Sequence, residues 1–116
     1  MASTQETQAT LTHHLESFAA KDVNAILSDF GENSVIFTPD GLVKGLGEIR
    51  KFFNNLMGIV TPEFLSSMKM LRQDVDGEIA YLLWTAGDIV PLGTDTFIVR
   101  DGKIVVQTFA AYMRSG

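Results

Sequence analysis

The sequence contains no cysteine and only two histidines, His13 and His14. The absence of thiols excludes disulfide scaffolds, thiolate nucleophiles, iron–sulfur clusters and cysteine-ligated zinc. The two histidines are adjacent, so on a helix they diverge and cannot chelate one metal ion by themselves. Gly45 and Gly47 lack the third glycine of a dinucleotide-binding loop. We therefore expect no cofactor and no metal, and any chemistry must use a few carboxylates, imidazoles and hydroxyls or a bound molecule.

Basic residues are also scarce, with 9 Lys and Arg against 14 Asp and Glu and a net charge of −5. This balance argues against general nucleic-acid binding, because phosphate contacts need a basic surface. No apolar run approaches the roughly 18 residues of a membrane span. The first ten residues are polar and lack Lys and Arg, unlike a secretory signal. We expect a cytoplasmic protein with no membrane partner.

The rest of the composition is that of a soluble globular protein. The chain has 116 residues, of which 46% are hydrophobic and 20% are charged. This length suits a single domain over residues 1–116 and leaves no room for a second core of ordinary size. Residues 1–8 are polar and are expected to form a flexible or frayed N-terminus.

Three segments have the periodicity of amphipathic helices. In residues 10–20 the apolar side chains recur at spacings of three and four; His14 belongs to that apolar face, whereas His13 points away from it. A second helix is predicted from Asp22, its N-cap, as far as Gly31, which follows its end. The third helix has the clearest apolar stripe, formed by Ile49, Phe52, Phe53, Leu56 and Met57.

The second half of the chain has the pattern of strands joined by tight turns. Asp76-Gly77 and Asp101-Gly102 are hairpin signals, and Pro39–Gly41 and Pro91–Gly93 are predicted turns. An α+β domain is predicted, with three N-terminal helices packed on one face of a curved, mainly antiparallel sheet. Its predicted strands cover residues 34–38, 64–75, 79–90, 94–99 and 103–113.

Four short segments then occur in a characteristic order: Ala20-Lys21-Asp22-Val23, Phe37-Thr38-Pro39-Asp40-Gly41, Gly45 with Ile49, and Asp95 through Ile104. With the order of elements, they resemble the SnoaL-like branch of the superfamily typified by nuclear transport factor two and ketosteroid isomerase. The resemblance covers residues from about Leu11 to Tyr112. It implies a cone-shaped α+β barrel with an internal pocket between helices and sheet, and a homodimer formed through the sheet. It implies no single reaction, because members include isomerases, polyketide cyclases, epoxide hydrolases and binding proteins.

The isomerases of that superfamily carry three polar residues with defined roles. One is a tyrosine that hydrogen-bonds the substrate oxygen, one is an aspartate that moves the proton, and one is a second, proton-donating aspartate. The resemblance puts His14, Thr38 and Asp95 at or near these three positions. Because a threonine cannot accept a proton as a carboxylate does, isomerisation by the usual mechanism of the family is not expected.

His14 and Asp95 are the candidate catalytic residues. The imidazole of His14 is either a donor or acid–base group in the pocket, or a core histidine bonded to a backbone carbonyl. Asp95 shares strand parity with Phe97 and Val99, so it should face the apolar side, where loss of solvent raises the pKa of a carboxyl. The alternative for Asp95 is a solvated position at the mouth of the strand, just after Gly93.

Further side chains are predicted to line a ligand pocket. Thr38, Tyr81 and Gln107 would supply its polar groups. Both faces of residues 79–90 are apolar, and Trp84, which lies on the face opposite Tyr81, is interpreted as an interface or core anchor. The apolar candidates for the pocket wall are Phe18, Phe53, Met57, Phe97 and Phe109.

Three functional hypotheses follow from the sequence. The first is a binding protein for a small apolar or carbonyl-bearing molecule, acting as a homodimer. The second is an enzyme of the isomerase or polyketide-cyclase type that transfers protons through His14 and Asp95. The third is a dimeric protein-interaction module, which would have a filled interior. The identity of the ligand is beyond the sequence.

Overall fold

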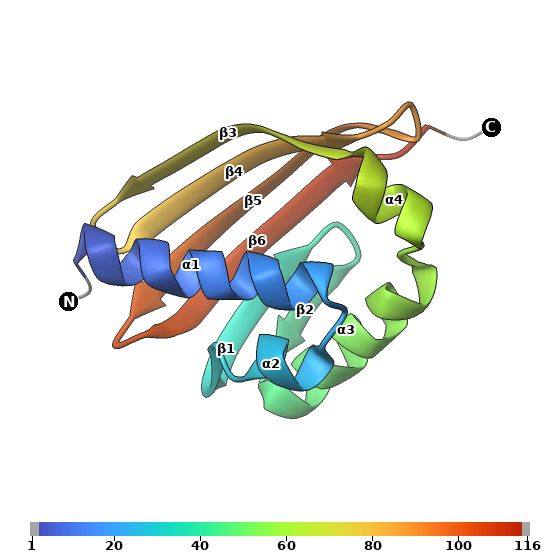
Figure 1. Ribbon diagram of the computed structural model, residues 1–116. Coiled ribbons are helices and arrows are strands. Elements are labelled where there is room, and N and C mark those ends of the chain that lie inside the picture. Colours follow the sequence, from blue (N-terminus) through green and yellow to red (C-terminus); the bar gives the residue numbers. More distant parts are fainter. Residues whose placement is uncertain (1–2, 115–116) are drawn as a thin grey trace.

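Helices dominate the first half of the chain and strands the second half, in the computed structural model, which describes residues 3–114. The helices pack on one side of a single sheet (Figure 1). The elements are α1 (Thr4–Ala19), α2 (Val23–Leu27), β1 (Phe30–Thr38), β2 (Gly41–Lys44), α3 (Leu46–Ile59), α4 (Pro62–Ser67), β3 (Met68–Asp76), β4 (Ile79–Ala86), β5 (Val90–Arg100) and β6 (Lys103–Tyr112).

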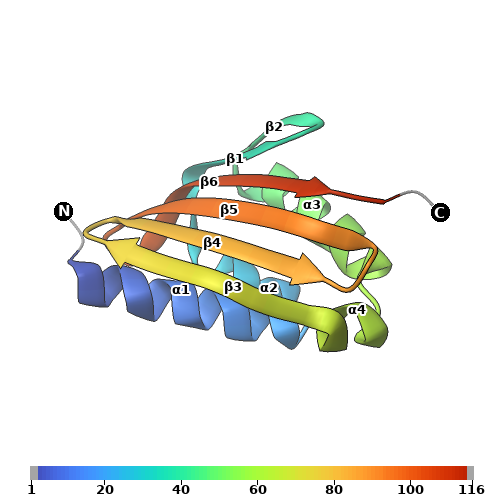
Figure 2. The same cartoon turned by 90° about the horizontal axis from the view of Figure 1, so that it is seen from above.

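The sheet has six strands in the order β2-β1-β6-β5-β4-β3. Every neighbouring pair is antiparallel except β1 and β6, which run parallel. The sheet is curved and, in the described part of the chain, it stays open, since β2 and β3 form two separate edges (Figure 2). The expected α+β class is therefore confirmed, with two differences: four helices instead of three cover the sheet, and the cone does not close into a full barrel.

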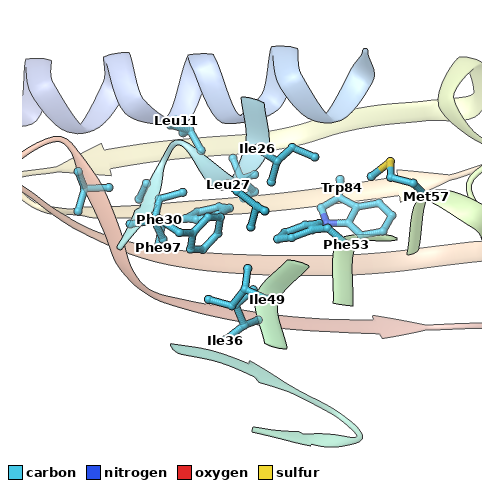
Figure 3. Packing of buried hydrophobic residues seen from close by; sticks show 14 of the residues in the cluster. Leu11, Ile26, Leu27, Phe30, Ile36, Ile49, Phe53, Met57, Trp84 and Phe97 are labelled. Carbon is cyan, nitrogen blue, oxygen red and sulfur yellow. The ribbon is translucent and has the colours of Figure 1, made fainter. Parts of the chain in front are cut away.

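The apolar core fills the space between the helices and the concave face of the sheet. Leu11 from α1, Ile26 from α2 and Phe53 from α3 meet Phe97 from β5 and Trp84 from β4 in this layer (Figure 3). Along β4 and β5 the buried residues alternate with partly exposed ones, as expected for strands with one covered face. The site described below lies between the helices and this face of the sheet.

Helix α1 begins earlier than the sequence predicts. Ser3 is its N-cap and accepts a hydrogen bond from the backbone N–H of Glu6. Thr7 is fully buried and donates from its hydroxyl to the carbonyl of Gly77, at a distance of 2.6 Å. The expected frayed segment 1–8 is thus helical from Thr4 onward, while Met1 and Ala2 lie outside the described residues. The hydroxyls of Thr4 and Thr7 hold this polar segment to the β3–β4 turn. The sequence does not reveal this contact, because Gly77 lies about 70 residues further along the chain.

Three other boundaries differ from the predicted ones. Helix α2 starts at the predicted N-cap Asp22 but ends at Leu27, because Phe30 and Gly31 already belong to β1. Residues 62–67 form α4 rather than the start of a strand, with Thr61 as N-cap and Pro62 in its first turn. Gly93 lies within β5 rather than in a turn. The predicted Asp-Gly hairpin turns, in contrast, are both present, with positive φ at Gly77 and Gly102.

Candidate functional site

Asp95 lies in the middle of β5 and faces the helices. Its neighbours across the sheet are Leu82 on β4 and Phe109 on β6. The alternation of β5 places Gly93, Asp95 and Phe97 on the same covered face, and Asp95 is only 9% exposed. The structure thus excludes a solvated position at the mouth of the strand.

Two neutral donors hold the Asp95 carboxyl from either side. The indole N–H of Trp84 donates to Oδ2 at 2.8 Å, and the Nε2 of Gln107 donates to Oδ1 at 3.1 Å. Trp84 pairs with Gly93 on β5 and Gln107 pairs with Phe97, so the two donors approach Asp95 along opposite diagonals of the sheet. The carboxyl is therefore fixed in orientation without an ion pair.

Gly93 makes room for the indole ring of Trp84. A Cβ atom at position 93 would lie 2.3 Å from Cε2 of the ring, far inside van der Waals contact. Any larger residue at position 93 would push the ring away from its place. Gly93 thus allows Trp84 to lie flat across β5 and reach the carboxyl of Asp95.

Burial perturbs the protonation of this carboxyl. Loss of solvent raises the pKa of Asp95 to about 6, while the hydrogen bonds from Trp84 and Gln107 act in the opposite direction and hold part of the shift back. Asp95 is therefore mostly ionised at neutral pH but gains a proton under mildly acidic conditions. A carboxyl with a pKa in this range is suited to acid–base work.

His14 faces the same interior from α1 and is 3% exposed. Its ring makes edge contacts with Phe30, Phe53 and Phe97, with centroid distances of 5.9, 6.1 and 5.3 Å. Burial lowers the pKa of this imidazole to about 4, so it is neutral at physiological pH. Its Nδ1 atom is buried and has no hydrogen-bond partner among residues 3–114. The alternative of a core histidine satisfied through Nδ1 by a backbone carbonyl is therefore not what the structure shows.

His14, Asp95 and the two donors to Asp95 all line one cavity of about 510 Å³. Its walls come from the C-terminal part of α1, from α3 and α4, and from the concave face of β4, β5 and β6. Most of the lining side chains are apolar. The polar side chains deepest in it are His14, Asp95, Gln107 and the indole N–H of Trp84.

The predicted ligand-binding residues divide into two groups. Phe53 and Met57 are both buried in the core, but only Phe53 reaches the cavity wall. Thr38 and Tyr81 lie outside the cavity, so neither these two residues nor Met57 belongs to the site. The predicted residues that do line the cavity are Phe18, Phe53, Phe97, Gln107 and Phe109.

Thr38 and Tyr81 fall outside the cavity for different reasons. Thr38 ends β1, and its hydroxyl donates to the carbonyl of Gly41 and accepts from the N–H of Asp40, which closes the β1–β2 turn. Tyr81 belongs to the outer face of β4, because Ala80, Leu82, Trp84 and Ala86 are the residues that this strand buries. The prediction that Tyr81 lines the pocket is wrong, because both faces of β4 are apolar and Tyr81 lies on the face away from the helices.

Trp84 is the main functional residue that sequence reasoning missed as part of the site. The sequence predicts an interface or core anchor, whereas Trp84 lines the cavity and donates to Asp95. One sequence feature could have indicated this role: Gly93 on β5, which leaves space for a large ring. It becomes informative only when the β4–β5 register, which pairs it with Trp84, is known.

The described residues contain no group of three or more His, Asp or Glu side chains that could hold a metal ion. Nor does any helix in residues 3–114 have the length and apolar character needed to cross a membrane.

No family model matches the chain, and no curated protein matches it. Among solved structures, it is similar to an NTF2-like protein of unknown function from Mesorhizobium loti, with a TM-score of 0.75 and 21% identity over 94% of this chain and 93% of that one. The chain has the NTF2-like fold. This fold is the one expected from the resemblance to the superfamily of nuclear transport factor two and ketosteroid isomerase.

Two further solved structures show how little the NTF2-like fold alone says about activity. One is an LEH-like epoxide hydrolase from M. tuberculosis, with a TM-score of 0.71 and 16% identity over 93% of this chain and 84% of that one. The other is a de novo designed protein with a curved β-sheet, with a TM-score of 0.71 and 13% identity over 93% and 86% of the two chains. Function must therefore be argued from the side chains in the cavity.

Proposed function

We propose that this protein binds a small, largely apolar molecule in the cavity between its helices and its sheet. The observation that carries the proposal is that two residues with buried, unpartnered polar atoms line an apolar cavity. The Nδ1 of His14 and the Oε1 of Gln107 have no partner among residues 3–114, and both residues line the cavity beside Asp95. A buried polar atom without a partner costs roughly 1–3 kcal/mol, which a bound polar group would recover.

Titration with Nile red, a neutral apolar dye, tests this proposal. We expect a fluorescence increase with saturable binding. Leu56 lines the cavity, so Leu56→Trp should fill part of it and abolish binding. Leu71 is an exposed residue of β3 outside the cavity, and Leu71→Trp is the matched control that should bind as the wild type does. Binding that survives Leu56→Trp unchanged would show that the dye sits elsewhere and would refute the proposal.

A second candidate function is proton transfer on an enolisable carbonyl compound. The specific observation in its favour is a buried carboxyl with a pKa of about 6 in the same cavity as a neutral imidazole. In this mechanism the Asp95 carboxylate removes a proton from the carbon next to the carbonyl group. A neutral His14 N–H donates a hydrogen bond to the carbonyl oxygen as negative charge develops there, and the Asp95 carboxyl then returns the proton to carbon.

Deuterium exchange at the α-carbon of a cyclic ketone, followed by NMR, measures this activity. Asp95→Asn should lower the exchange rate by roughly a hundredfold or more, because an amide cannot act as the base. Asp74→Asn, which removes an exposed carboxylate on β3 away from the cavity, should leave it unchanged. Exchange no faster than in buffer would remove this second candidate and would leave the binding function intact.

A homodimer formed through the outer face of the sheet is part of the proposed function. The middle of the central strands carries no charge there, and Arg100, at the end of β5, pairs with Glu78. The outward residues in the middle are Tyr81 and Leu83 on β4, Thr94, Thr96 and Ile98 on β5, and Val106, Thr108, Ala110 and Tyr112 on β6. Light scattering should report twice the mass of the chain, and Thr96→Arg at the centre of this face should yield a monomer. Thr12→Arg on the exposed side of α1 is the control. A wild-type monomer at micromolar concentration would contradict the dimer.

The hypothesis of a pure interaction module is not favoured. It required an interior filled by side chains, whereas the structure has a cavity of about 510 Å³.

A further inference from the structure

The charged side chains that line the cavity are all acidic. Asp95 lies deep inside, and Glu63 and Asp88 are exposed lining residues from α4 and the β4–β5 loop. His14 is the other titratable lining residue, and it is neutral at physiological pH. No Lys or Arg belongs to the described residues that line the cavity. The charges of the lining residues therefore favour cations over anions. The ammonium group of Lys21, which is not a lining residue, donates to the carbonyl of the lining residue Val60 at 2.6 Å.

The carboxylate of Asp95 lacks a counter-ion. Within residues 3–114 it forms no ion pair, and its two hydrogen-bond partners, Trp84 and Gln107, are neutral. A carboxylate that is 9% exposed is normally paired with a cation or bound to a metal, because desolvation of an isolated charge is costly. No positively charged side chain in residues 3–114 therefore balances the negative charge of Asp95.

The polar end of the cavity offers mainly hydrogen-bond acceptors. Each oxygen of Asp95 receives one donor from the protein and can accept another. The Oε1 of Gln107, a residue that is 5% exposed, is a buried acceptor with no donor in the described part of the chain. A carbonyl group could not satisfy these acceptors, and a hydroxyl could satisfy only one. An ammonium group has three N–H donors.

Aromatic rings surround this end of the cavity. Trp84, Phe97 and Phe109 belong to the same face of the sheet as Asp95, and Phe53 faces them from α3. Aromatic faces attract cations as well as apolar groups, so such a wall suits an apolar molecule with a positive charge.

We infer that the ligand of this cavity is a small apolar molecule carrying one protonated amine, whose ammonium group pairs with the Asp95 carboxylate beside Gln107. This inference rests on the proposed binding function and names the chemical class of its ligand. Loss of charge at Asp95 should therefore weaken the binding of amines more than that of neutral ligands of the same shape.

Three probes of the same shape and different charge test the inference. They are naphthylmethylamine, naphthylmethanol and naphthoate, each titrated by calorimetry. We expect the amine to bind at least about tenfold more tightly than the alcohol, and the alcohol more tightly than the carboxylate. The chain has one tryptophan, so its indole N–H gives one resonance, which should shift on binding of the amine because Trp84 shares the Asp95 carboxylate with it.

Variants separate Asp95 from the general negative charge of the protein. Asp95→Asn keeps the shape of the side chain, and rotation of the Gln107 amide lets it accept from the new amide group. This variant should lose the preference for the amine over the alcohol. Asp74→Asn removes one exposed charge outside the cavity and should keep the full preference.

The outcomes distinguish this inference from the proposed function. If the alcohol binds in the cavity but the amine binds no more tightly, or if Asp95→Asn retains the preference, the inference is wrong and the binding function stands. If none of the probes binds and Nile red does not bind either, both are wrong.

Discussion

Replacing Asp95 by asparagine should change the way the stability of the protein responds to acid. The pKa of this carboxyl is about 6 in the folded protein, against an ordinary value of 3.8. The folded state therefore binds the proton more tightly than the unfolded state. Protonation of Asp95 therefore contributes to the free energy of unfolding. This contribution is complete below pH 3.8 and is lost as the pH rises through about 6, a change of about 3 kcal/mol.

His14 changes the stability of the protein in the opposite direction over nearly the same pH range. Its pKa is about 4 in the folded protein, against an ordinary 6.5, so the folded state binds this proton less tightly than the unfolded state. The corresponding stabilisation is complete above pH 6.5 and is lost as the pH falls through about 4, again by about 3 kcal/mol. In the wild-type protein the two contributions largely offset each other between these values.

Urea unfolding at several pH values between about 4 and 7 measures this balance. Asp95→Asn should lose stability steeply on acidification, because only the His14 contribution remains. His14→Gln should instead gain stability as the pH falls, and Asp74→Asn, an exposed control, should follow the wild type. Curves for Asp95→Asn and His14→Gln that run parallel to the wild-type curve would refute the reasoning, since they would mean that neither group is desolvated in the folded state.

Three further predictions concern the surroundings of the site. Gly93→Ala should displace the indole ring of Trp84, shift its emission and its N–H resonance, and destabilise the protein by about 1–3 kcal/mol; an unchanged resonance would contradict the packing. In a proton NMR titration, His13 should have a pKa above 6.5 because it hydrogen-bonds and pairs with Asp29, and Asp29→Asn should bring that pKa down; a His13 value unaffected by the variant would exclude the pair. Thr7→Val should destabilise the protein by about 1 kcal/mol in urea unfolding, because the hydrogen bond that holds α1 to the β3–β4 turn is lost, and a neutral effect would show that the start of α1 is not docked.

The parts of the fold that the sequence predicts well are those with local causes. The Asp-Gly turns need positive φ, which Gly77 and Gly102 supply, and the apolar stripe of α3 has a clear helical period. Helix α4 has only six residues, too few for a helical period to be visible, so the sequence predicts a strand from residue 64. The sequence predicts a turn at Gly93, because nothing local reveals that the indole ring of Trp84 on β4 lies over it.

The candidate site was predictable where alternation along one strand was enough. Asp95 and Gln107 share parity with buried aromatic residues, and His14 lies on the apolar stripe of α1; all three line the cavity. Tyr81 and Trp84 could not be assigned in the same way, because β4 is apolar on both faces. Which face meets the helices depends on the packing of the whole sheet.

The parallel pairing of β1 with β6 has a consequence for how the chain folds during synthesis. The last of the described strands lies between β1 and β5, in the middle of the sheet, and supplies Gln107 to the site. Until β6 has left the ribosome, β1 has no partner on that side, and its long-range contacts cannot form. During synthesis, the segment from α1 through β2 is therefore expected to remain incompletely folded, with apolar surface exposed. A chain that stops before β6 should aggregate rather than fold into a slightly smaller sheet.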